Sequence, residues 1–418
     1  MTSLATTAGK SAGISNFARF ALLAAWTVLC LAGWVQPASA QAGVEFKDVA
    51  VDYQFGEELV FQARISPFGD VSEVYLFIQP AGEQTRLVKI DAFEQGDILY
   101  RYDLRQHALR SFSEVVCWFR AVTKDGAKFE SSRQSLYYID NRMPWQTLEA
   151  GSVQVNWLAG DLFYGQAALN VARTGLKAAA NILPNFDLPR LQIFIYQSAS
   201  RLQEAVVYGS NIQVVGHASP DLGVVLVSIP PGFDQQFEME RQIPHEIMHL
   251  MIYQAVQDQY NNVPTWLNEG LASQVEGIPN SDYPRAIQKA VKENKLLSIA
   301  SLCPSFPSDA SGAFLAYAQS ASFVRFLQNK VGNRGLADLL GRYKNGLNCS
   351  EGVLATSNLS LDQLDYRWRQ ETLGMDTGWL AVQNLSPYLL VGGLIIGAPL
   401  AAAGWSRRRG RAETKGIR

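Results

Sequence analysis

The sequence predicts a multidomain protein with an all-β sandwich of immunoglobulin or fibronectin type, then an α+β domain, then one C-terminal transmembrane helix. A chain of 418 residues is long enough for two or three domains. Short strand patterns come first, helical patterns dominate later, and uncharged apolar runs stand near both ends. With 48% hydrophobic and 18% charged residues, the composition is that of a globular chain.

Residues 1–40 have the pattern of a secretory signal peptide. Two basic residues precede an apolar run at 20–35, and "ASA" follows at 38–40. A basic segment, an apolar segment and small residues in this order predict cleavage after Ala40. An uncleaved membrane anchor is the alternative. Both interpretations place the rest of the body outside the cytoplasm.

Residues 43–142 contain the strand patterns of the sandwich. In "ELVFQARI" every second residue is apolar, as in a half-buried strand. Similar segments follow, separated by Gly, Asp and Pro, and Asp125-Gly126 favours a hairpin. About seven strands without a convincing helix are typical of an immunoglobulin or fibronectin sandwich. Because these residues contain no catalytic set that we can find, we expect a spacer or a binding module.

Residues 150–375 have the patterns of an α+β domain. "VQVNWLAG" and "LPRLQIFIYQS" read as strands, and the Ala- and Leu-rich stretch between them is typical of a helix. "VVGHASPDLGVVLVSIPP" contains two short extended segments around a turn. Helical patterns dominate after residue 243, so strands precede helices, as in α+β folds.

The last predicted element is an apolar run at 388–405, which holds no charge across 18 residues. This is close to the ~20 residues of a spanning helix, and a buried core helix is the alternative. Aromatic residues stand at both of its ends, and the tail 406–418 begins with "SRRRGR", which predicts a cytoplasmic tail. Residues 376–387 would form a linker. The sequence therefore predicts a single-pass protein of the cell membrane with an extracytoplasmic body.

The charge of the chain bears on its partners. Without its two basic ends, the body at 41–406 has a formal charge of −9. An acidic body is poorly suited to bind nucleic acid or anionic lipid headgroups. We therefore expect no nucleic-acid partner, and membrane contact only through the C-terminal helix.

The cysteines also fit a compartment outside the cytoplasm. Cys303 and Cys349 lie in loop-like stretches and could form a disulfide there. Cys117 lies in a strand pattern and is expected to be a buried free thiol. The sequence does not favour a zinc site made of cysteines, because the chain has no Cys-x-x-Cys pair.

The stretch "IPHEIMHLMIY" at 243–253 is the strongest candidate for chemistry. On a helix, His245 and His249 lie on one face and could bind one metal ion. A catalytic Zn²⁺ takes three protein ligands and a water, and Glu246 could accept a proton from that water. A helix that carries two histidines without a metal is the alternative. Pro244 would be natural in the first turn of this helix.

The third ligand distinguishes between families of zinc sites. A metzincin would have Gly at 252 and His at 255, but these positions hold Ile252 and Ala255. Glu269 follows His249 by twenty positions, within "PTWLNEGLAS". A second helix that brings Glu269 to the first would close a site of two histidines and one glutamate, with one Zn²⁺ per chain.

"HEIMH" followed by "WLNEGLAS" resembles the gluzincin metallopeptidases, the clan of thermolysin and aminopeptidase N, and especially peptidase MA-like domains. The resemblance covers roughly residues 150–375. It implies a zincin-like fold, a zinc cofactor and a peptide or protein substrate. In the aminopeptidase N branch a tyrosine before an apolar helix stabilises the oxyanion, and "AYAQSASFVRFL" gives Tyr317 that role.

The sequence also departs from this family. It lacks the Gly-x-Met-Glu-Asn loop with which aminopeptidases hold a free amino terminus, so exopeptidase activity is unsupported. The choice between endo- and exopeptidase activity stays unresolved. The carboxylate that supports a histidine in thermolysin would fall near Ser273, so no such partner is identified. Gly216, His217 and Ala218 occupy the place of an edge strand, to which an extended peptide could add.

Two functions follow from these patterns. The first is a membrane-anchored, extracytoplasmic zinc metallopeptidase in which Glu246 activates water and Tyr317 stabilises the oxyanion. The second is a non-catalytic cell-surface binding or adhesion protein with a structural metal site. The presence of Glu246 favours the enzyme, because a structural site has no need of a base.

Overall fold

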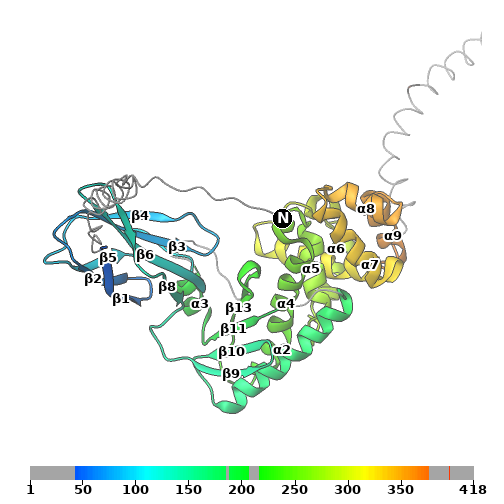
Figure 1. The fold of residues 1–418 in the computed structure, drawn as a ribbon. Helices are drawn as coiled ribbons and strands as arrows, with labels where there is room; N and C mark the ends of the chain where they lie inside the picture. The colour runs from blue at the N-terminus through cyan, green and yellow to red at the C-terminus, as the bar shows by residue number, and fades with distance from the viewer. Residues whose placement is uncertain (1–42, 185–187, 207–215, 376–394, 396–418) are drawn as a thin grey trace, which may run out of the picture. The chain divides into compact units, whose positions relative to one another are not determined.

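The structure, a computed structural model, describes residues 43–184, 188–206, 216–375 and 395 (Figure 1). These residues form two compact units. The first consists of residues up to 109 together with 114–137, and the second of residues 110–113 together with those from 138 onward. The predicted signal peptide at 1–40 and the predicted span at 388–405 lie outside the described residues, apart from residue 395. Within the described ranges, no helix combines the length and the apolar character needed to cross a membrane.

The first unit is all-β and contains two antiparallel sheets. One sheet has the order β1-β2-β5, and the other has the order β4-β3-β6-β7, with β8 also paired to β6. The strands are β1 (Glu45–Gln54), β2 (Glu58–Ser66), β3 (Val71–Pro80), β4 (Arg86–Ile90), β5 (Asp97–Asp103), β6 (Ser113–Thr123), β7 (Lys128–Glu130) and β8 (Gln134–Tyr138).

Alternating side chains form the core of this first unit. In β2, Phe61 and Ile65 are buried, whereas Gln62 and Arg64 between them are exposed. Phe46 of β1 stacks on Phe119 of β6, with 5.9 Å between ring centroids, so the two sheets contribute to one core. The prediction of an all-β unit is confirmed here, and its immunoglobulin or fibronectin type stays a prediction.

The second unit begins with a five-stranded mixed sheet in the order β12-β13-β11-β10-β9. The strands are β9 (Gln146–Ala150), β10 (Val153–Trp157), β11 (Leu191–Tyr196), β12 (Gly216–Ser219) and β13 (Val224–Ser228). The pairs β10–β11 and β11–β13 are parallel. The outer strands β9 and β12 pair antiparallel with their neighbours, so β12 lies at one edge of the sheet.

Helices cover this sheet and form the rest of the unit (Figure 1). They are α2 (Leu162–Ile182), α3 (Ala199–Val206), α4 (Gln235–Val256), α5 (Thr265–Gln274), α6 (Tyr283–Lys292), α7 (Ala310–Lys344), α8 (Cys349–Ser357) and α9 (Leu361–Glu371). A short 3-10 segment, η2 (Gln257–Asn262), links α4 to α5. Apolar side chains of the sheet, α2, α4, α5 and α7 share one core, which fixes α4 against the sheet.

The position of Pro244 differs from the expectation of a first-turn proline. Helix α4 begins at Gln235, so Pro244 lies well inside it. Proline lacks an N–H and leaves the carbonyl four residues earlier without its helical partner. Here the carbonyl of Glu240 instead accepts a hydrogen bond from the Gly277 N–H at 2.8 Å. The break in the helical ladder thus ties α4 to the segment after α5.

The structure joins Cys303 and Cys349 by a disulfide, as the sequence analysis expected. Cys349 is the first residue of α8, and its sulfur also accepts a hydrogen bond from the indole N–H of Trp266 in α5. Cys117 is a buried free thiol.

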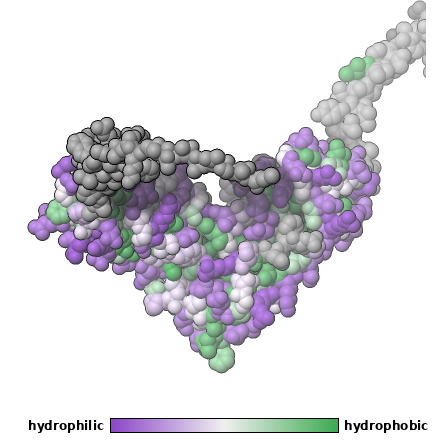
Figure 2. Space-filling view, in the orientation of Figure 1, coloured by the Kyte–Doolittle hydropathy of each residue, from purple (hydrophilic) through white to green (hydrophobic). Residues whose placement is uncertain are grey.

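On the face drawn in Figure 2, hydrophilic residues predominate and hydrophobic ones are scattered among them.

Candidate metal centre

Helix α4 presents two histidines at one point. His245 and His249 are separated by one helical turn, and their ring centroids are 5.0 Å apart. Glu269 of α5 faces both rings, with Oε2 at 3.3 Å from Nε2 of His245 and 3.9 Å from Nε2 of His249. The structure therefore brings together the three residues that the sequence predicted as metal ligands.

The sequence around Glu269 explains why α5 holds it there. Trp266 is fully buried and packs edge-on against Phe323 of α7, with 5.0 Å between ring centroids. At Gly270, a Cβ atom would lie 2.3 Å from a methyl group of Val324 and 2.7 Å from the carbonyl of Ser320. Only glycine lets α5 approach α7 this closely, so the residues flanking Glu269 set its position.

The donor set fits zinc. Two histidine nitrogens and one carboxylate oxygen, all within 4.8 Å of one another, are ligands that zinc accepts in catalytic sites. With bonds of about 2.0–2.1 Å, two ligands of a tetrahedral ion lie roughly 3.4 Å apart. The measured 3.3 and 3.9 Å separations are close to this value. Three protein ligands would leave a position for water, as a catalytic site requires.

His245 has a carboxylate partner that sequence reasoning missed. Its Nδ1 lies 2.9 Å from Oε1 of Glu276, whose side chain is only 5% exposed. A carboxylate there fixes the tautomer, so that Nε2 faces Glu269. The hydrogen bond from Gly277 to the carbonyl freed by Pro244 secures the adjoining backbone. The expected partner position, Ser273, lies three residues earlier in the chain.

His249 is supported by an amide instead. Its Nδ1 lies 3.0 Å from Oδ1 of Asn268, the residue before Glu269. The amide nitrogen of Asn268 donates to the hydroxyl of Tyr260 at 3.0 Å. This contact orients the amide so that its oxygen faces the histidine, which leaves Nε2 of His249 for the metal. Tyr260 belongs to η2, the segment that links α4 to α5.

Burial and mutual charge determine the pKa values at this site. Burial alone would lower the pKa of His245, but the hydrogen-bonded carboxylates of Glu269 and Glu276 raise it to about 10. Burial raises the pKa of Glu246, and the two neighbouring histidines oppose this shift only in part. The two histidines also hold the pKa of Glu269 below its usual value, although burial acts in the opposite direction.

Tyr317 lies in α7 beside the same site. Burial raises the pKa of its hydroxyl, and the charges of Glu269, Tyr283 and Glu246 raise it further. Its ring packs edge-on against Phe306, with 4.9 Å between centroids. Among the described residues, its hydroxyl makes no hydrogen bond to a protein group. Tyr260 has a pKa raised mainly by burial and also by Glu269 and Glu246, so a second phenol lies near these acids.

The predicted edge strand is present as β12. Gly216, His217 and Ala218 pair with β13 on one side, and no other described strand pairs with β12. Burial lowers the pKa of His217, and the charges of Arg110 and His249 lower it further. His217 is therefore near the metal centre and mainly neutral at pH 7. It does not belong to the ligand set.

The residues missed at the sequence level left weak signals. Asn268 lies within the Trp-Leu-Asn-Glu-Gly string, directly before Glu269. Tyr260 lies in η2, between the two helices that carry the ligands. Glu276 comes just after α5, where the chain turns back toward α4. No spacing rule predicts that turn, because it depends on the carbonyl that Pro244 frees in another helix.

Comparisons with known proteins find a sequence similarity within this unit. Residues 178–374 match the sequence model of the Peptidase MA superfamily. No curated protein matches the chain significantly in sequence. The chain is similar in structure to an M1 zinc metallopeptidase from Deinococcus radiodurans, with 12% identity and a TM-score of 0.31, over 78% of this chain and 94% of the other.

A second similar structure is an aminopeptidase N family protein from Idiomarina loihiensis, with 9% identity and a TM-score of 0.35, over 81% of this chain and 75% of the other. At TM-scores this low, neither likeness bears on the site or its chemistry. The sequence match includes every residue of the metal centre, from His245 to Tyr317. Residues 178–374 are therefore similar in sequence to the Peptidase MA superfamily.

Proposed function

We propose that the second unit is a zinc metallopeptidase that hydrolyses peptide bonds. The observation that carries this proposal is the convergence of His245, His249 and Glu269 within 4.8 Å, with Glu246 on the same helix beside the first ligand. A purely structural metal site has no need of a base beside its first ligand. When bound at these three residues, zinc would act as a Lewis acid toward the scissile carbonyl and lower the pKa of an attacking water.

Glu246 acts as the general base in this proposal. Its carboxylate takes the proton of the attacking water and passes it to the amine that leaves when the peptide bond breaks. Burial supports this role, because it raises the pKa of Glu246 toward the value that suits a group that both accepts and returns a proton.

The hydroxyl of Tyr317 stabilises the negative charge that develops on the carbonyl oxygen. A phenol with a raised pKa stays protonated at neutral pH and can donate a hydrogen bond to that oxygen. Its freedom from other described hydrogen-bond partners supports this role. The hydroxyl of Tyr260 is bonded to Asn268, so we assign it to positioning.

The substrate peptide adds to β12 at the edge with which no other described strand pairs. Gly216, His217 and Ala218 offer backbone groups on the side away from β13. His217 lies near His249 and is mainly neutral at pH 7, so it adds no positive charge to this strand. Main-chain pairing of this kind binds an extended peptide with little regard to sequence, and it leaves endo- and exopeptidase activity both open.

The test is the full chain with Glu246→Gln. Hydrolysis of a quenched fluorescent peptide library should fall by about 100- to 10,000-fold, the usual contribution of a general base. Zinc per chain, measured by metal mass spectrometry, should stay unchanged, because Glu246 is not a ligand. Wild-type turnover in this variant would rule out the proposed mechanism, whereas loss of zinc would make Glu246 a ligand.

We also propose that the protein is anchored in the cell membrane by residues 388–405, with its body outside and the tail 406–418 inside. The uncharged run followed by "RRRGR" supports this topology. Protease treatment of intact cells should remove the body while a tag after Arg418 survives. Digestion of that tag would reverse the topology.

A further inference from the structure

Residues 110–113 belong to the second unit, although the chain on both sides of them belongs to the first. Phe112 of this segment is buried and packs on Phe194 of β11, with 4.6 Å between ring centroids. The hydroxyl of Ser111 donates a hydrogen bond at 2.7 Å to the carbonyl of Ala205, near the end of α3. The segment is therefore anchored within the second unit, where it contacts the sheet and the chain that precedes β12.

Arg110, the first residue of this segment, forms a bidentate ion pair with Asp221. Its Nη2 donates to Oδ1 at 2.7 Å, and its Nη1 donates to the other carboxylate oxygen. Burial would raise the pKa of Asp221, but the hydrogen bond and the charge of Arg110 hold it below its usual value. Two parallel hydrogen bonds fix the orientation of the carboxylate as well as its distance. The charged pair thus holds η1 (Pro220–Leu222), the turn that joins β12 to β13.

Strand β12 has few other contacts that could fix its position within the sheet. It is only four residues long, from Gly216 to Ser219, and among the described strands it pairs with β13 alone. The segment 110–113 binds the chain before this strand at Ala205 and the chain directly after it at Asp221. The position of the edge strand therefore depends on residues outside its own hairpin.

The same ion pair lies close to the helix that carries the two histidines. Helix α4 packs against both β12 and η1. Tyr253 is one helical turn after His249 on this helix. Burial raises the pKa of Tyr253, the charge of Asp221 raises it further, and the charge of Arg110 lowers it. The pair is thus near the metal centre on the side of the edge strand.

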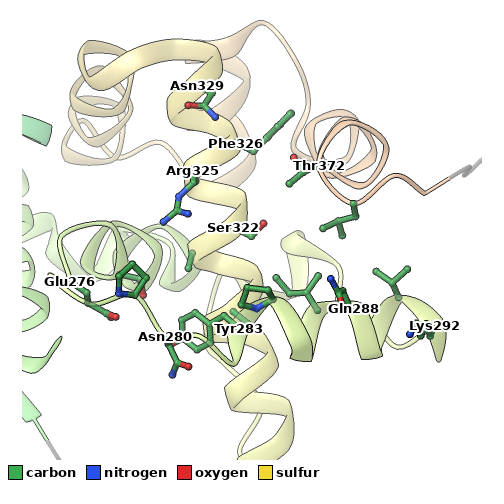
Figure 3. A pocket seen from close by; sticks show the side chains of 18 residues that line it. Glu276, Asn280, Tyr283, Gln288, Lys292, Ser322, Arg325, Phe326, Asn329 and Thr372 are labelled. Atoms are coloured by element: carbon green, nitrogen blue, oxygen red, sulfur yellow. The ribbon is translucent and has the colours of Figure 1, made fainter. Parts of the chain in front are cut away.

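A groove of about 570 Å³ between α6, α7 and the chain just after α9 has no such relation to the metal centre. In Figure 3, Glu276 and Asn280 lie at one end of this groove and Lys292 lies at the other. Its lining includes none of the three proposed ligands, and neither Glu246 nor Tyr317. The edge strand β12 is therefore the better supported surface for a peptide, and what anchors β12 bears on substrate binding.

We propose that Arg110 is a positioning residue for peptide substrates, because its ion pair with Asp221 holds β12 where an extended peptide adds. This inference rests on the proposed peptidase function. It adds to that function a residue outside 178–374, the range that matches the Peptidase MA superfamily. The ion pair acts on the edge strand and not on the metal ligands, so its loss should weaken peptide binding and leave the chemical step unchanged.

The test measures KM and kcat of the full chain with bound zinc, on the best peptide of the library. Arg110→Met should raise KM about fivefold, the upper range for a partly exposed ion pair, and leave kcat within about twofold. Arg110→Lys keeps the charge without the planar fork and should raise KM less. Exchange of the charges, Arg110→Asp with Asp221→Arg, should return KM to within about twofold of wild type.

The control for these variants is Arg285→Met. It breaks the exposed ion pair with Asp282 at the start of α6 and should alter neither KM nor kcat. An unchanged KM in Arg110→Met would overturn the proposal, and so would a loss of kcat as large as the rise in KM. If Arg110→Met does not fold, the exchanged pair decides, and a KM that is not restored overturns the proposal.

Hydrogen exchange at the amides of residues 216–219, measured by mass spectrometry, separates this inference from the peptidase function. If the wild-type chain hydrolyses no peptide, the peptidase function fails. Faster exchange of these amides in Arg110→Met than in Arg285→Met would then still support the anchoring of β12 by Arg110. Equal exchange in the two variants would overturn that anchoring, whatever the chain hydrolyses.

Discussion

The two units of this protein differ in whether they contain a cluster of buried charged side chains. In the all-β unit, ion pairs such as Arg64–Asp97 lie at the surface, with both side chains more than half exposed. In the second unit, three glutamates and two histidines gather where each side chain is at most 17% exposed. Ion pairs at the surface contribute about 0–1 kcal/mol to stability, so replacing them has little effect. Burying a charge costs several kcal/mol of stability unless an opposite charge or hydrogen bonds compensate for it. The difference indicates that burying these charges costs stability at one point of the second unit, which the proposed zinc ion would compensate for.

The largest effect should come from removing a ligand. Glu269→Ala should lower zinc affinity by about 1,000-fold or more, roughly 4 kcal/mol, because two histidines alone leave the ion without its anionic ligand. The control, Glu73→Ala, removes an exposed carboxylate that is paired with Lys89 in the first unit. Its zinc affinity should stay unchanged. Competition with a chelator of known affinity measures both, and equal affinities would refute the three-ligand site.

The disulfide should give the next largest effect, and only in the second unit. Cys303 and Cys349 are 46 residues apart, and closing a loop of this length restricts the unfolded chain by up to roughly 4 kcal/mol. Replacing both by alanine should therefore lower the Tm of the second unit. The transition of the all-β unit should not move in the same calorimetric scan. A shift of both transitions would mean that the units unfold together.

Glu276 should have a smaller effect than a ligand. Glu276→Ala removes the carboxylate behind His245, and such supporting residues change metal affinity by about 10- to 100-fold. Glu276→Gln retains an acceptor for Nδ1 and should lose less. The same chelator competition measures both variants, with Glu293→Ala as an exposed carboxylate control. A loss as large as that of Glu269→Ala would make Glu276 a direct ligand.

Sequence could predict the ligands but not their support, for a physical reason. His245 and His249 are related by helical periodicity, and the Trp-Leu-Asn-Glu-Gly string around Glu269 carries its own packing requirement at Gly270. Glu276 reaches His245 only because Pro244 frees a carbonyl that captures Gly277. That contact joins two helices and has no local sequence signature. The sequence favours a first turn for Pro244 because proline is best tolerated there, whereas α4 begins at Gln235.

Alternation along single strands made the all-β unit easier to predict. In β6, Val115, Cys117 and Phe119 are buried at every second position, which is the period of a strand with one face in a core. Which strands pair with one another, such as β8 with β6, depends on the folded sheet and cannot be predicted from the sequence of either strand alone.

The smallest expected effect tests whether this apolar core is closed to water. Burial raises the pKa of the Cys117 thiol to about 12, above the ~8.5 of an exposed thiol. Between these values the unfolded chain releases a proton that the folded unit retains, so the free energy of unfolding falls as pH rises through this range. Below pH 8 the contribution is fully present. At pH 9.5 it should have fallen by about 1 kcal/mol.

Urea unfolding of the wild type and of Cys117→Ala, at pH 7.5 and 9.5, measures this contribution. Other titrating groups act equally on both proteins, so the difference between them isolates the thiol. Wild type should lose about 1 kcal/mol relative to the variant between the two pH values. A constant difference would mean that the folded unit already admits water to Cys117. The contrast between a dry apolar core in one unit and a charged buried centre in the other would then be weaker than the burial of β6 indicates.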